Sequence, residues 1–294
     1  MIYLLLTVLL NVVLSVILKL LPRLKADALQ TIVANYWVCV ITGSIFVGHF
    51  PINVQGMQQA WFPWALVMGT GFITIFNLLA YSTKIDGITT TTIANKLSLV
   101  IPVLFSVFLY NEHAGLWKIV GIVLAFPAVY LTSRVKEDEH KAQNLYIPAS
   151  LFIGSGLLDT LVKFVEHHYL NTNELQAVYL IYTFAAAGTV GLIVIAVIVS
   201  MKKIELHWRN LVVGTILGVP NYFSIYFLVR LLNSRYLQSS AAIPVNNIGI
   251  LVASTLVAIL FFKEKVTTLR IVGLVLSVLA ILLIAMGDMH GGSI

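Results

Sequence analysis

The stretch "NEHAGLWKIVGIVLA" (Asn111–Ala125) returns 152 residues later, without a gap, as "KEKVTTLRIVGLVLS" (Lys263–Ser277). Glu112 falls on Glu264 in this alignment. A segment that recurs at a fixed offset marks a repeated structural unit. The chain is therefore expected to contain two related halves.

The repeat extends beyond this segment. Asn95 falls on Asn247 at the same offset, whereas an offset of 144 residues aligns Asn77 with Asn221. The difference of eight residues corresponds to an insertion before the ninth apolar stretch, near "LLNSRYLQ".

The composition is that of a membrane protein. Of 294 residues, 59% are hydrophobic and 10% are charged, whereas a soluble domain carries about 25% charged residues. The net charge of +6 comes from basic residues scattered between apolar spans, which form no basic face for nucleic acid. The single cysteine, Cys39, excludes a disulfide framework and a thiol metal site.

Ten apolar stretches are long enough to cross a bilayer, whose hydrocarbon core needs about 20 residues of helix. They span residues 2–21, 28–48, 63–83, 88–110, 116–133, 146–166, 175–199, 210–232, 239–262 and 267–287. The charged link "SRVKEDEHKAQN" separates the first five stretches from the last five.

This division predicts an all-α membrane protein with ten transmembrane helices in two inverted five-helix repeats. Residues 1–135 would form the first repeat, 136–144 the charged linker and 145–294 the second repeat. An odd number of helices per half makes the second half enter the membrane from the opposite side. Secondary transporters use this inverted plan and bind substrate near the midplane between the repeats.

The pattern resembles the drug/metabolite transporter superfamily, specifically its ten-helix EamA-type members. The shared motif is an acidic residue, Glu112 or Glu264, in a short turn before a glycine-containing helix. The glycine that usually precedes this acidic residue is replaced by Asn111 and Lys263. No Glu or Asp occurs in the first helix, which argues against the cation/proton exchange of the small multidrug members.

Asn95 and Lys96 lie deep inside the fourth apolar stretch. A lysine there costs about 2.5–3.5 kcal/mol, so it needs a partner. Lys96 could pair with Asp159 or Asp86 and hold helices together, or it could meet an anionic group of a substrate. The related dipeptide Asn246–Asn247 has no second lysine, and this asymmetry favours the substrate.

Large polar side chains also recur along other helices. These side chains are Asn77, Tyr81, Asn221, Tyr222 and Tyr226. We expect them to line a central cavity together with Asn95, Asn246 and Asn247. Hydrogen bonds between helices, which strengthen membrane helix association by about 0.6–2 kcal/mol, are the structural alternative.

Acidic side chains within the helices are few. Asp159 lies four residues before Lys163 on one helix, so the two could neutralise each other. Asp159 could otherwise couple transport to protons. Glu112 and Glu264 lie at helix ends and are assigned to turns and helix capping.

No motif indicates an enzyme, a cofactor or a metal site. The histidines fall in loops or at helix ends, and the adjacent pair His167–His168 would point in different directions on a helix. The sequence has no nucleophile elbow and no phosphate-binding glycine loop. The expected partners are a small-molecule substrate and the lipid bilayer, with no nucleic acid, and the chain is expected to be a monomer.

The resemblance implies a multi-pass protein of the plasma (inner) membrane. The expected function is secondary transport, in the export direction, of a small polar or amphipathic metabolite such as an amino acid or related organic anion. It would proceed by alternating access around a central cavity. The alternatives are a flippase for a lipid or lipid-linked substrate and a non-transporting membrane scaffold or receptor.

Overall fold

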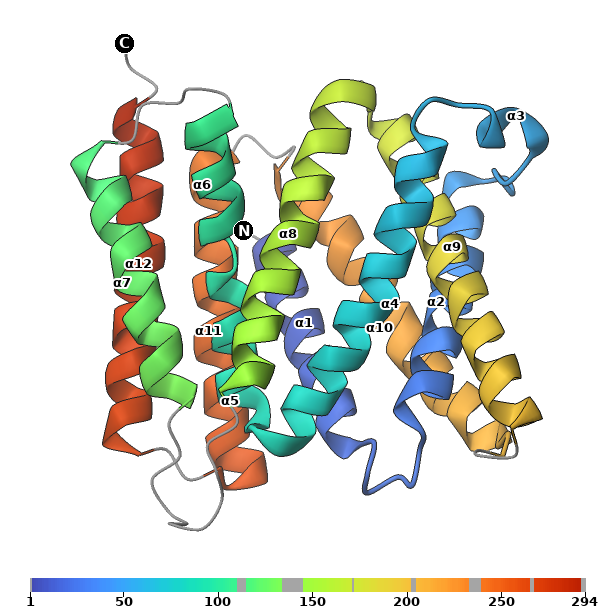
Figure 1. The fold of residues 1–294 in the computed structure, drawn as a ribbon, viewed down its shortest axis with the longest axis horizontal. Helices are drawn as coiled ribbons and strands as arrows, with labels where there is room; N and C mark the ends of the chain where they lie inside the picture. The colour runs from blue at the N-terminus through green and yellow to red at the C-terminus, as the bar shows by residue number, and fades with distance from the viewer. Residues whose placement is uncertain are drawn as a thin grey trace. The chain divides into compact units, whose positions relative to one another are not determined.

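The computed structural model describes residues 2–109, 115–133, 145–170, 172–201, 205–232, 239–264 and 267–291. These residues form helices and connecting turns, with no strand among them. The helices are α1 (Ile2–Leu20), α2 (Ala28–Val47), α3 (Val54–Met57), α4 (Phe62–Ile85), α5 (Gly87–Leu97), α6 (Val100–Leu109), α7 (Leu116–Ser133), α8 (Tyr146–Tyr169), α9 (Asn173–Ser200), α10 (Trp208–Leu232), α11 (Ser239–Phe262) and α12 (Thr268–Gly291) (Figure 1).

The all-helical membrane fold is confirmed. Within the described ranges, nine helical segments are long and apolar enough to cross a membrane, and Leu116–Thr132 is a shorter apolar helix. The observed helices begin and end close to the predicted limits. Two differences stand out: the predicted fourth helix is divided into α5 and α6, and a four-residue helix, α3, precedes α4.

Local sequence signals explain where several helices begin and end. The Asp27 side chain accepts a hydrogen bond from the Gln30 amide at 2.9 Å and caps the start of α2. Thr172 caps α9 in the same way. The end of α2 is Gly48, whose φ of +86° is the left-handed conformation that glycine adopts without a steric penalty.

The chain folds into two compact units, and each takes segments from both halves of the sequence. Unit 1 comprises Met1–Val16, Tyr81–Leu157 and Ser224–Ile294, and unit 2 comprises Ile17–Ala80 and Leu158–Phe223. The spatial units therefore do not coincide with the two sequence repeats, whose boundaries remain a prediction.

In unit 1, α7 and α12 pack closely against each other (Figure 1). A Cβ atom built on Gly121 would lie 2.8 Å from the carbonyl oxygen of Ala280, and one on Gly273 would lie 3.0 Å from that of Ala128. Gly121 and Gly273 are 152 residues apart, and so are Ala128 and Ala280, so the contact is reciprocal at the offset of the repeat. Small residues let membrane helices approach to this distance.

The same unit contains α5, which packs on α11. The run "TTTT" at 89–92 spreads its hydroxyl groups around the helix because successive residues are rotated by about 100°. Three of these hydroxyl groups bond to three different neighbours: Thr89 to the Glu264 carboxylate at 3.2 Å, Thr90 to the Thr132 carbonyl at 3.1 Å, and Thr91 with the Ser82 hydroxyl at 2.8 Å. The polar run therefore fastens α5 within unit 1.

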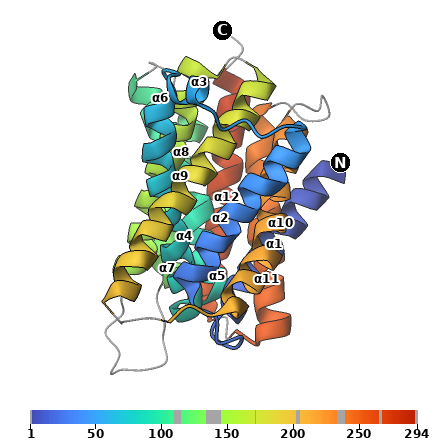
Figure 2. The same ribbon diagram turned by 90° about the vertical axis from the view of Figure 1, so that its right-hand side faces the viewer.

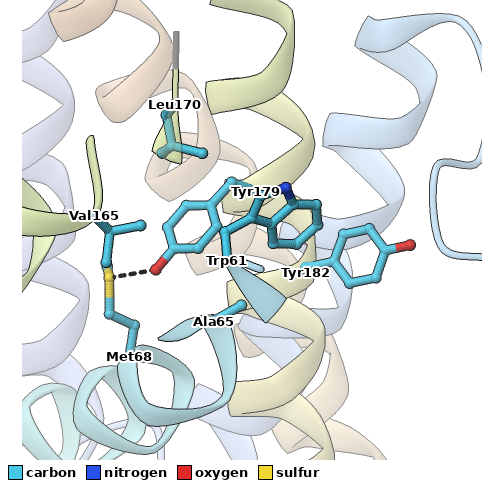
Figure 3. Close-up of a cluster of buried hydrophobic side chains, with 7 residues drawn as sticks. All are labelled: Trp61, Ala65, Met68, Val165, Leu170, Tyr179 and Tyr182. Atoms are coloured by element: carbon cyan, nitrogen blue, oxygen red, sulfur yellow. Dashed lines mark hydrogen bonds between the residues drawn. The ribbon is translucent and has the colours of Figure 1, made fainter. Parts of the chain in front are cut away.

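In unit 2, α2 runs alongside α9 (Figure 2), and an aromatic cluster joins α4, α8 and α9 (Figure 3). Trp61 packs edge-on against Tyr179 and Tyr182, with ring centroids 5.7 and 5.0 Å apart. The Tyr179 hydroxyl donates to the Met68 sulfur at 2.8 Å. The Tyr182 hydroxyl accepts from the Asn53 amide at 2.9 Å and so holds the segment that precedes α4.

Candidate functional site

The residues proposed from the sequence as substrate or proton contacts are divided between the two units. Those in unit 1 are Tyr81, Asn95, Lys96, Tyr226, Asn246 and Asn247, and those in unit 2 are Asn77, Asp159, Asn221 and Tyr222. We describe the two sets separately.

Asn95 and Lys96 lie in the last turn of α5, next to an interruption in the helix. The two residues Ser98 and Leu99 separate α5 from α6, and the Ile101 amide bonds to the Ser98 carbonyl at 2.9 Å in a tighter turn. Pro102 has no N–H, and its ring clashes with the carbonyl four residues earlier, that of Ser98. The predicted fourth stretch, residues 88–110, is therefore formed by two helices, and its polar pair lies at the end of the first.

The Asn95 side chain is held by α8. Its Nδ2 donates to the Ser155 hydroxyl at 3.0 Å, and its backbone carbonyl accepts from the Ser98 hydroxyl. The α8 backbone comes close here, since a Cβ atom on Gly156 would lie 2.7 Å from the Ser98 carbonyl oxygen. Ser155 was not assigned to the site from the sequence, although it aligns with Asn11 at the offset of 144.

Lys96 is half-buried at the C-terminal end of α5. A cation is favourable there because the last carbonyls of a helix carry partial negative charge. Asp86 is the N-cap of the same helix, ten residues earlier, which corresponds to about 15 Å along the axis. That distance is too long for a direct ion pair, so the structure does not support Asp86 as the partner. The pairing with Asp159 remains a prediction.

On α11, Asn246 and Asn247 are both buried, with 3% and 9% of their surfaces exposed. The Oδ1 atom of Asn246 has no hydrogen-bond partner in the part of the chain that the structure describes. A buried acceptor left in this state costs about 1–3 kcal/mol. Asn246 is therefore a place where a donor group of a ligand would be stabilised.

The two tyrosines of this set have different surroundings. Tyr81 is 52% exposed at the end of α4. Tyr226 is half-buried, and its hydroxyl oxygen accepts from Nε of Arg230 at 2.9 Å, with the guanidinium 5.4 Å from the ring centroid. Tyr226 thus presents its ring together with a cation from the next turn of α10.

In unit 2, Asn221 joins two helices. Its Nδ2 donates to Oδ1 of Asn35 at 3.1 Å, and both residues are buried. The Cys39 thiol lies 3.8 Å from the same oxygen. This is the interhelical hydrogen bonding that was the structural alternative. Tyr222, the next residue, is buried and packs against Phe46, with ring centroids 6.2 Å apart.

Asn77 and Asp159 are more accessible. Nδ2 of Asn77 bonds to the Ile73 carbonyl of its own helix at 2.8 Å, as Thr70 and Thr74 bond to carbonyls one turn earlier. These three polar side chains of α4 thus make bonds within the helix. Asp159 lies on α8 with its side chain exposed.

Glu264 caps a helix, as predicted, and the helix belongs to the other half of the sequence. Its carboxylate accepts from the amides of Ile88 at 2.8 Å and Thr89 at 3.4 Å, at the start of α5. Its repeat partner, Glu112, lies outside the described residues. Within the described ranges, no three His, Cys, Asp or Glu side chains gather as metal ligands.

Comparisons with known proteins agree with the helical arrangement. Residues 1–134 match the EamA-like transporter family. A Haemophilus influenzae protein described as uncharacterized is 25% identical over 262 residues, which are 86% of each chain. One crystal structure of a protein is similar in fold, with a TM-score of 0.56 at 12% identity over 94% of this chain and 97% of that chain.

The family match implies a membrane transporter of small solutes. It agrees with the nine apolar helices long enough to cross a bilayer among the described residues. Residues 1–134 thus match the EamA-like transporter family, and this match confirms the resemblance to the drug/metabolite transporter superfamily.

Proposed function

We propose that the protein is a secondary transporter of the plasma (inner) membrane that exports a small polar or amphipathic metabolite by alternating access. An amino acid or a related organic anion is the substrate class that suits Lys96. The observation that carries the proposal is the position of Asn95 and Lys96 at the broken end of α5. Interrupted helices place polar groups and free backbone atoms at transporter sites.

Two features of unit 1 support this assignment. Lys96 offers a cation, and Asn246 on α11 offers a buried oxygen without a partner among the described residues. The helices that carry them, α5 and α11, pack against each other. A substrate with an anionic group and a hydrogen-bond donor would use both side chains.

The test is a thermal-stabilisation screen of the purified protein against amino acids, organic acids, nucleosides and sugars. A ligand that binds the folded state raises its stability by RT ln(1 + [L]/Kd). We expect an anionic compound to stabilise wild type, and Lys96→Met to abolish that stabilisation while remaining folded. Lys84→Met, at an exposed lysine in the last turn of α4, is the matched control and should keep the response.

Other outcomes would redirect the assignment. A much less stable Lys96→Met that keeps every hit would make Lys96 a structural counter-ion. Scrambling of labelled lipid in proteoliposomes, without flux of soluble compounds, would favour the flippase. Binding without any flux would favour a scaffold or receptor. Flux measured with and without an imposed pH gradient, in wild type and Asp159→Asn, decides whether Asp159 couples transport to protons.

A further inference from the structure

The helix that carries Asn95 and Lys96 is short. α5 contains 11 residues, about half the length of helix that crosses a bilayer core. Its N-cap residue, Asp86, makes no side-chain hydrogen bond to the first amides of α5 in the described structure. The stability of α5 therefore depends on contacts from outside the helix.

The Glu264 carboxylate supplies the missing cap. Oε1 accepts from the Ile88 amide at 2.8 Å, and Oε2 accepts from the Thr89 amide at 3.4 Å and the Thr89 hydroxyl at 3.2 Å. A carboxylate at a helix N-terminus is stabilised by the helix dipole and by charge-assisted hydrogen bonds. The contact joins residues 175 and 176 positions apart in the chain.

The backbone on both sides is shaped for this contact. α11 ends with Lys263 at a φ of +52°, and the Glu264 amide bonds back to the Ala258 carbonyl at 3.1 Å. A left-handed residue just after the last helical turn is a common way to end a helix, and here it turns Glu264 out of α11. On the other side, Gly87 has a φ of +90°, and a Cβ atom there would lie 2.7 Å from Oε1 of Glu264. Glycine thus leaves room for the carboxylate.

The other end of α5 is also fastened by the second half of the sequence. Asn95 donates to Ser155 of α8 at 3.0 Å. All these residues belong to unit 1. A short helix held at its first turn by Glu264 and at its last turn by Ser155 has a fixed position along its whole length.

We propose that Glu264 is a positioning residue that anchors α5 and thereby fixes Asn95 and Lys96. The functional meaning of this anchor rests on the proposed role of Lys96 as a substrate contact. The anchor itself is tested without a substrate, so a failed ligand screen and a failed anchor are distinguishable.

The experiment is hydrogen–deuterium exchange of the full chain in detergent micelles, read on peptides that cover α5. Glu264→Gln keeps one acceptor oxygen but loses the charge and the second acceptor. We expect exchange across residues 88–97 to become about fivefold faster, which corresponds to about 1 kcal/mol, within the range for a charge at a helix N-terminus. Exchange in α9 should stay at the wild-type rate. Glu174→Gln is the matched control, because Glu174 is an exposed acid in the first turn of α9.

Thr89→Val is a milder second variant, because it removes one of the three bonds to Glu264 and keeps the amides. It should accelerate exchange in α5 by a smaller factor. A second readout is N-ethylmaleimide labelling of Lys96→Cys in a Cys39→Ala background, with and without Glu264→Gln. We expect the labelling rate to change severalfold with Glu264→Gln and not with Glu174→Gln.

Two results would overturn the proposal. One is unchanged exchange in α5 for both Glu264→Gln and Thr89→Val. The other is a uniform acceleration in all helices with an unchanged labelling rate at position 96, which would make Glu264 a contributor to overall stability without a positioning role.

Discussion

The fourth and ninth helices occupy equivalent places in the sequence repeat, yet one is interrupted and the other is continuous. α5 and α6 are separated at Ser98, whereas α11 runs without a break from Ser239 to Phe262. At the offset of 152 residues, Pro102 of α6 corresponds to Ser254 of α11. Pro102 favours the interruption because it removes one amide donor and excludes the carbonyl four residues earlier, although α7 and α10 continue past Pro127 and Pro220.

The chemical consequence of this difference concerns the polar pair before the interruption. In α5 the pair is Asn95–Lys96, next to a helix end; in α11 it is Asn246–Asn247, within a continuous helix. Pro244 does not interrupt α11; it is the sixth residue of the helix, and the carbonyl that its ring would exclude lies in the first turn. The charged residue thus occurs where the helix terminates and the neutral pair where it continues.

The largest expected effect comes from making the continuous helix resemble the broken one. Ser254→Pro should destabilise the protein by about 3 kcal/mol or more, because it removes a buried amide donor and clashes with the Ile250 carbonyl. Thermal unfolding in detergent micelles measures this loss. Ser254→Ala removes only the hydroxyl, which bonds to the Leu251 carbonyl at 3.2 Å, and should cost about 1 kcal/mol. A Ser254→Pro protein as stable as Ser254→Ala would refute a contribution of proline to the interruption.

The next effect compares two helical glycines. A Cβ on Gly156 would lie 2.5 Å from Ile101 Cδ1 and 2.7 Å from the Ser98 carbonyl oxygen, whereas one on Gly249 would meet Val8 Cγ2 at 2.9 Å. Gly156→Ala should therefore lower the stability of the protein by about 1–3 kcal/mol, because its methyl group overpacks against the segment between α5 and α6. Gly249→Ala should remain within about 1 kcal/mol of wild type, since alanine favours the helix and Val8 is a side chain. If Gly156→Ala and Gly249→Ala lower the unfolding temperature equally, the segment between α5 and α6 can move to make room for the methyl group.

The sequence predicted the number and limits of the long helices because runs of about 20 apolar residues have few alternatives in a bilayer. It left open whether Pro102 interrupts the fourth helix, since prolines are tolerated in many membrane helices, as Pro127 and Pro220 are here. It predicted a capping role for Glu264, but not that the capped helix is α5. That contact spans 176 positions in the chain, and no local pattern encodes it.

The two asparagine-containing pairs should respond oppositely to an apolar substitution. Asn95→Leu should lower stability by about 1 kcal/mol because it removes the bond to Ser155. Asn246→Leu should raise it by about 1 kcal/mol, because it removes a buried acceptor that has no partner among the described residues. Unfolding temperatures of both variants, measured without ligand, give the comparison. A loss of stability in Asn246→Leu would mean that its oxygen is already satisfied and is not reserved for a ligand.

The smallest expected effect lies at the end of α11, where EamA-type relatives usually carry glycine. Lys263 has a φ of +52°, a left-handed conformation that costs a non-glycine residue about 1–2 kcal/mol. Glycine loses more backbone entropy on folding, so Lys263→Gly should stabilise the protein by a net amount of about 0.5–1 kcal/mol. Lys263→Ala keeps the Cβ atom and removes the charge, and it should not stabilise. If both variants stabilise equally, the lysine charge is responsible and not the backbone. If only Lys263→Gly stabilises the protein, the strain lies in the turn that directs Glu264 toward α5. The same variant should then leave the exchange rate of the α5 amides unchanged or make it slower, because the turn that holds Glu264 is less strained.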